Sequence, residues 1–172
     1  MDGEQRIPRI ARVVSGGQTG ADRAALDAAI AAGLPYGGWC PAGGWAEDLT
    51  EPPGVLARYP ALRAADSADP SARTLLNVRD SHATLIVRGA DAASPGTDLT
   101  LRAAGRLRRP CLVTPGGTGT LAQIDAWLAA VGDGLTLNVA GPRESQQPGV
   151  YRTTRELLAV LLDSGPASAP SD

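Results

Sequence analysis

The stretch SGGQTGAD at residues 15–22 lies between two segments of different pattern. ARVVSGG at 11–17 is a short apolar run that ends in two glycines, as a buried strand does. ADRAALDAAIAAG at 21–33 is rich in alanine and is followed by Pro35, which is typical of a helix with a glycine terminator. A turn from strand to helix is the place where open α/β sheets bind ligands. This stretch therefore predicts an α/β fold with a ligand site at the turn.

The rest of the chain repeats the alternation of short apolar runs with longer helical patterns. This order is typical of a parallel sheet covered by helices on both faces, in a single domain over residues 9–163. The last nine residues, 164–172, have the composition of a disordered tail. Strands are expected at 82–89, 110–114 and 135–141, and helices at 71–81, 97–109, 119–131 and 149–164.

Composition excludes several classes of protein. Of 172 residues, 43% are hydrophobic and 20% charged, which is usual for a globular domain. All 16 basic residues are arginine, so a Schiff-base lysine and an ordinary P-loop are excluded. A net charge of -2 argues against a dedicated nucleic-acid binder. No apolar run approaches the length of a membrane helix, and the N-terminus lacks a secretory pattern, so we expect a cytoplasmic protein. Two distant cysteines and one histidine are too few for a common zinc site.

The turn at 15–22 combines backbone freedom with polar side chains. Asp22 caps the start of the helix, and Arg23 adds a positive charge beside it. Free amides at a helix start bind anions such as phosphate, so we expect an anion there. The alternative is a tight turn before an ordinary capped helix. The glycines are Gly16, Gly17 and Gly20, and the polar residues between them are Ser15, Gln18 and Thr19.

The segment 34–69 has many glycines and prolines and no clear period, which in a compact domain indicates a functional segment. Within it, Trp39 and Trp45 are placed to stack on a flat heterocycle. The alternative is a loop held by two buried indoles. Glu47 and Asp48 either orient a ligand or form a solvated acidic edge.

Two further segments carry candidate ligand residues. Arg73, Asn77 and Asp80 recur on one face of a predicted helix, with Ser81 just after it. Arginine on this face contacts either a phosphate or a surface carboxylate. SPGTDLT at 94–100 opens a helix after a strand, so it should face the same crevice as residues 15–22. Its candidate residues are Gly96, Thr97 and Thr100.

The segment NVAGPRES at 138–145 ends the last predicted strand. Pro142 fixes the backbone before Arg143, whose guanidinium can bind an anion through two hydrogen bonds, with Ser145 donating nearby. The alternative is that Arg143 pairs with a carboxylate and holds its own loop.

These motifs occur in this order in one known family. From about residue 9 to residue 162, the chain resembles the molybdenum carrier family, a circularly permuted, YpsA-like branch of the SLOG superfamily. The resemblance implies a Rossmann-like three-layer fold that binds the molybdenum cofactor or another phosphorylated, nucleotide-like ligand without consuming it. It also implies a homo-oligomer, with molybdoenzymes or cofactor-synthesis proteins as partners. The matching positions are Ser15 to Gly20, Asp22, Arg23, Gly96, Thr97 and Thr100, together with the segments 77–81 and 138–145.

One departure bears on catalysis. Relatives in the wider superfamily that cleave nucleoside monophosphates carry a glutamate shortly after a PGG-x-GT turn. Here PGGTGT at 115–120 is followed by Gln123, whose amide cannot accept a proton as a base does. We therefore expect a carrier with no catalytic residue. The alternatives are a hydrolase of an N-glycosidic bond, with Glu47, Asp48 or Asp80 as its acid, and a nucleotide-sensing module.

Overall fold

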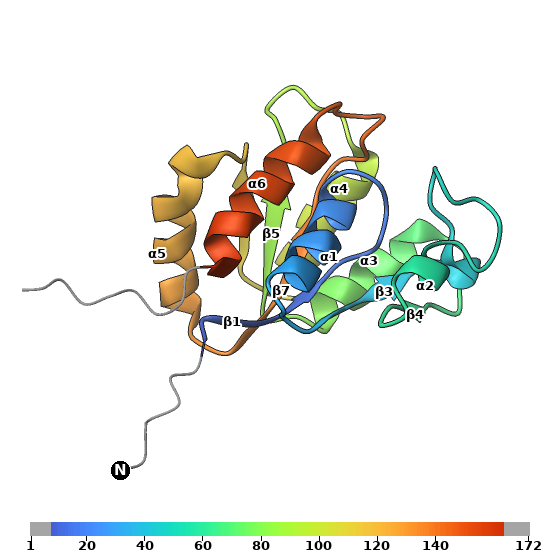
Figure 1. The fold of residues 1–172 in the computed structure, drawn as a ribbon, viewed down its shortest axis with the longest axis horizontal. Coiled ribbons are helices and arrows are strands. Elements are labelled where there is room, and N and C mark those ends of the chain that lie inside the picture. Colours follow the sequence, from blue (N-terminus) through green and yellow to red (C-terminus); the bar gives the residue numbers. More distant parts are fainter. Residues whose placement is uncertain (1–7, 164–172) are drawn as a thin grey trace, which may run out of the picture.

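The structure is a computed structural model that describes residues 8–163. Its centre is a sheet of five parallel strands in the order β2-β1-β7-β5-β6 (Figure 1). The sheet confirms the predicted parallel α/β architecture. The strands are β1 (Ile10–Val14), β2 (Tyr36–Gly37), β5 (Ala83–Val87), β6 (Cys111–Thr114) and β7 (Leu135–Ala140).

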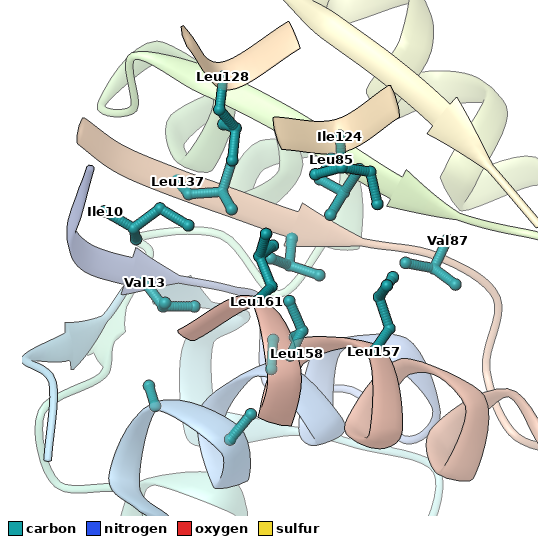
Figure 2. Packing of buried hydrophobic residues seen from close by; sticks show 14 of the residues in the cluster. Ile10, Val13, Leu85, Val87, Ile124, Leu128, Leu137, Leu157, Leu158 and Leu161 are labelled. Carbon is teal, nitrogen blue, oxygen red and sulfur yellow. The ribbon is translucent and has the colours of Figure 1, made fainter. Parts of the chain in front are cut away.

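Helices cover both faces of the sheet. On one face, the main core joins the strands to α1 (Ala21–Ala31), α5 (Leu121–Val131) and α6 (Val150–Asp163). Figure 2 shows leucines of α6 directed at the strands, beside Ile124 and Leu128 of α5. On the other face, α3 (Pro70–Arg79) and α4 (Pro95–Arg106) pack through Val78, Ala103 and Ala104.

Local sequence explains where these elements begin and end. All five residues of β5 are buried, as expected for a strand covered on both faces. The chain turns away after α1 at Gly33, whose φ of 69° suits glycine. Asp69 and Ser94 cap α3 and α4 by accepting backbone hydrogen bonds, and a proline follows each cap.

The segment 34–69 forms a small unit beside α1 and α3 (Figure 1). It contains β3 (Trp39–Cys40), a 3-10 turn η1 (Ala42–Gly44), α2 (Val55–Arg58) and β4 (Arg63–Ala64). Strands β3 and β4 pair in parallel. Its own apolar cluster includes Cys40, Val55, Tyr59 and Leu62, packed on Leu26 of α1.

Two residues of the predicted strands are less buried than a strand covered on both faces would make them. In the strand predicted at 110–114, Cys111 is half-buried because β6 is an edge strand. His82, the first residue of the strand predicted at 82–89, is exposed before β5, and its Nδ1 accepts a hydrogen bond from the Thr136 N–H at 2.8 Å. A second 3-10 turn, η2 (Thr118–Thr120), precedes α5. The predicted tail at 164–172 lies outside the described residues. None of the helices between residues 8 and 163 is long and apolar enough to cross a membrane.

Candidate functional site

A small polar cavity lies at the carboxyl ends of β1 and β7, between α3 and α4. Its volume of about 10 Å³ is the room that one water molecule needs. The position is the one at which open α/β sheets bind ligands. The sequence analysis had selected five of the lining residues as ligand residues, namely Gly16, Asp22, Arg73, Asn77 and Thr100.

A buried ion pair forms one wall of the cavity. Asp22 is 3% exposed, and its Oδ2 accepts a hydrogen bond from Nη1 of Arg73 at 2.9 Å. The same Oδ2 accepts from the Gln18 N–H at 3.4 Å. Burial raises the pKa of Asp22 above its ordinary value, and the attraction of Arg73 opposes this shift only in part. Asp22 is therefore the carboxyl group of this site that most readily holds a proton.

Arg73 is incompletely paired. Its Nε is buried and has no hydrogen-bond partner within the described part of the chain. The guanidinium lies against the backbone of Gly16, where a Cβ atom would stand only 1.6 Å from Nη1. Glycine is therefore required at position 16 for Arg73 to reach Asp22. The Gly16 N–H also makes no hydrogen bond inside residues 8–163.

Neutral polar side chains complete the walls and are held by their own contacts. The side-chain amide of Asn77 bonds both backbone groups of Trp39, at 2.8 and 2.9 Å, and so fixes β3 against α3. Thr100 donates to the Gly96 carbonyl at 3.0 Å. Asn138 donates to the Thr84 hydroxyl at 3.2 Å.

The predicted anion cradle at residues 15–20 is enclosed. The Ala21 N–H, at the start of α1, donates to the Pro142 carbonyl at 3.4 Å. A Cβ on Gly20 would lie 2.3 Å from that same oxygen, so the loop after β7 passes directly over the turn. On the other side, Gly17 lies against Leu62 and Val55 of the 34–69 unit. Only the Gly16 side of the turn lines the cavity.

Glu47 joins the turn to the loop after β7. It accepts hydrogen bonds from the hydroxyl groups of Thr19 and Ser145, the latter at 2.6 Å. Burial tends to raise the pKa of Glu47, but these hydrogen bonds together hold it below its ordinary value. The guanidinium of Arg143 is 4.0 Å from Glu47 and 5.3 Å from the centre of the Trp45 ring.

The other three polar residues at the turn also make hydrogen bonds. Arg23 is 5% exposed and makes two hydrogen bonds of 2.9 Å to Asp48, which lower the pKa of that carboxyl group. Gln18 accepts from the backbone N–H groups of Thr19 and Glu47 at 3.0 Å. Ser15 is buried and donates to the Asp22 carbonyl at 3.0 Å. Arg23 and Gln18 therefore hold the 34–69 unit against the turn.

The other predicted residues lie at two places around the cavity. At the start of α4, Gly96 is exposed, while Thr97 is buried against Ser94. At the end of α3, the half-buried Trp39 donates to Asp80 through its indole at 2.9 Å. A hydrogen bond from Arg79 lowers the pKa of Asp80. Ser81 is buried and donates to the Val78 carbonyl.

Among the lining residues, sequence reasoning missed Thr74 and included Asn138, Val139 and Ala140 only as part of the matching segment 138–145. Thr74 precedes Asn77 by three residues, so its position on the same face of the helix was a usable signal. Val139 and Ala140 carried no such signal, because apolar residues near a strand end are ordinary core residues. Within residues 8–163, no three His, Cys, Asp or Glu side chains are grouped to hold a metal ion.

The all-parallel sheet, with helices on both faces and a cavity at its carboxyl edge, defines a Rossmann-like α/β domain. The chain belongs to the circularly permutated YpsA SLOG family, whose model matches residues 13–162. It is similar to a solved structure from Syntrophus aciditrophicus SB described as a "putative molybdenum carrier protein". The identity is 36%, the TM-score is 0.80, and the match covers 95% of this chain and 100% of the other. No curated protein matches the chain significantly.

Proposed function

We propose that this protein carries the molybdenum cofactor, or a related phosphorylated pterin or nucleotide-like anion, at the carboxyl edge of its sheet. The observation that carries the proposal is the unpaired Nε of Arg73. A buried guanidinium nitrogen without a partner is costly, and an oxyanion is the ligand that satisfies it best. The Gly16 N–H lines the same cavity and offers a second donor.

The size of the cavity limits what enters it. A volume of about 10 Å³ does not accept a pterin ring. We therefore place one oxygen of an oxyanion group of the ligand at Arg73 and the flat ring outside the cavity. The exposed start of α4 at Gly96 and the half-buried faces of Trp39 and Trp45 are the surfaces proposed for the ring.

The proposed role of Arg143 and Ser145 is to bind a second anionic group of the same ligand. Arg143 keeps about a third of its side chain exposed above Trp45, so its guanidinium is accessible. Ser145 must exchange its bond to Glu47 to take part. The other residues of the turn act by holding the loops that surround the cavity.

The three carboxyl groups considered as the acid of a glycosidic hydrolase, Glu47, Asp48 and Asp80, fit a carrier better. Hydrolysis with an acid catalyst needs a carboxyl group that is protonated near neutral pH. Hydrogen bonds lower the pKa values of Glu47, Asp48 and Asp80, which keeps these groups ionised. We propose that the carrier is a cytoplasmic homo-oligomer and that molybdoenzymes or cofactor-synthesis proteins exchange the ligand with it.

The test is the identity of the molecule that travels with the protein. The protein is purified from its own cells, the small molecules are released, and they are analysed by mass spectrometry and by assays for molybdenum and tungsten. We expect a phosphorylated pterin in near-stoichiometric amount. Incubation with nucleoside monophosphates is the second arm, in which release of free base at a useful rate would replace the carrier by a hydrolase.

A further inference from the structure

The cavity contains an unpaired acceptor as well as an unpaired donor. Both hydrogen bonds that Asp22 accepts reach Oδ2, and Oδ1 has no partner among the described residues. Asp22 lines the cavity although the residue is 3% exposed. Oδ1 of Asp22 is therefore an unpaired carboxylate oxygen that is not fully buried, so it is open to a ligand in the cavity.

The charges around this oxygen are balanced before any ligand enters. Arg73, from α3, is the cation bonded to Asp22. Arg23, on α1, is the other charged group that acts on Asp22, and it is already paired with Asp48. The side chains that line the cavity from α4 and β7 at Thr100 and Asn138 are neutral. An added anion therefore faces one carboxylate and shares a single arginine with it.

We propose that Asp22 makes this site selective for an oxyanion that brings its own proton, namely the monoanion of a phosphate monoester. This inference rests on the proposed function and deepens it. One ligand oxygen enters the cavity and places its proton on Oδ1 of Asp22, while Arg73 and the Gly16 N–H donate to the same oxygen. Sulfate esters and molybdate carry no such proton at neutral pH, so they meet the bare carboxylate and are repelled. In the molybdenum cofactor, the phosphate end and not the oxo-metal end therefore faces the cavity.

Two probes whose monoanions have equal charge and nearly equal shape test this selectivity. At pH 6, methyl phosphate is about half monoanion, since its second pKa is about 6, whereas methyl sulfate is a monoanion without a proton. Binding is followed by NMR through the backbone amide signal of Gly16. We expect the dissociation constant of methyl phosphate to be about ten-fold lower than that of methyl sulfate, or lower still. A ten-fold ratio is the same free energy as a shift of one pKa unit.

The variant Asp22→Asn supplies the second arm, because an amide can donate to either probe. We expect the two probes to bind Asp22→Asn within about three-fold of one another, since the repulsion is gone. The matched control is Asp133→Asn, which changes an exposed carboxylate paired with Arg9 and should keep the selectivity of the wild type. A well-dispersed spectrum shows that each variant is folded.

The wild-type protein decides the matter even if Asp22→Asn does not fold. Because burial raises the pKa of Asp22, its protonation at lower pH should let methyl sulfate bind more tightly as the pH falls from 7 to 5. Equal affinity for both probes at pH 6 would overturn the selectivity and leave the carrier function in place. Binding of neither probe, together with no retention of a phosphorylated pterin, would instead remove the proposed anion site itself.

Discussion

Arg73 and Arg143 are both candidate ligand residues, but they differ in burial and in their partners. Arg73 is mostly buried, with one charged partner and one unpaired nitrogen. Arg143 is at the rim, stacked near Trp45 and 4.0 Å from Glu47. The sequence predicted both as ligand residues. The contacts of Arg143 also match the alternative weighed from the sequence, in which it holds its own loop.

Replacing Arg143 by methionine separates these two roles, since methionine keeps the apolar stem and removes the charge. We expect binding of the phosphorylated ligand to weaken by about 1.5–3 kcal/mol, on the order of 10- to 100-fold, because a charge-assisted contact is lost. Binding is measured by calorimetry and stability by thermal melting. A variant that melts earlier but binds with unchanged affinity would make Arg143 a structural residue.

Gly16 is the second residue at which a small change should have a large effect. In Gly16→Ala, the new Cβ takes the space of the Arg73 guanidinium, which must leave Asp22. We expect a loss of stability of about 3–5 kcal/mol, the usual cost of separating a buried ion pair. The control is Gly105→Ala, where the new Cβ meets open space within α4. That change should stabilise the protein by about 0.5–1 kcal/mol in denaturant unfolding. Equal stability of Gly16→Ala and the wild type would contradict the packing described for Arg73.

At the level of elements, the strands and helices with a clear hydrophobic pattern were predicted from the sequence. The elements without such a pattern were not. The central strands and the long helices were predicted because their apolar residues recur at fixed spacing. The elements of 34–69 are two to four residues long, too short for any period to appear. The enclosure of the turn at 15–20 was equally hidden, since it depends on Glu47 and Pro142, which are distant in the sequence.

The attachment of the 34–69 unit should depend on pH. The pKa of Glu47 is lower in the folded protein than its ordinary value of 4.5, so its stabilising effect is present above pH 4.5 and is lost as the pH falls through the lowered value. We expect Glu47→Gln to be less stable than the wild type at pH 7 and nearly equal to it at pH 3. Urea unfolding at the two pH values measures this difference. An equal difference in the free energy of unfolding at both pH values would show that the charge of Glu47 does not contribute to stability.

For the whole molecule, the predicted homo-oligomer requires a surface that a second copy of the chain can cover. Most alanines of α1 are buried within the protomer, so they are not available to a second chain. Exposed apolar residues are spread over several elements, and those on the packed pair α3 and α4 include Leu75 and Leu101, which are 47% and 42% exposed.

Sedimentation equilibrium at micromolar concentration tests the oligomeric state. We expect a dimer or a larger assembly, which buries the exposed leucines and so gains apolar contact. Leu75→Glu with Leu101→Glu should then shift the protein toward the monomer. A wild-type protein that sediments as a monomer would exclude the oligomer.

Equilibrium binding of the molybdenum cofactor to the wild type and to Arg73→Met tests the central claim most directly. Arg73→Met leaves Asp22 without its cation, so the double variant with Asp22→Asn is measured beside it to keep a folded reference. We predict tight binding by the wild type and a loss of about 10- to 100-fold or more in both variants, with Arg152→Met on the exposed part of α6 as an unaffected control. Unchanged affinity in a folded Arg73 variant would contradict the account.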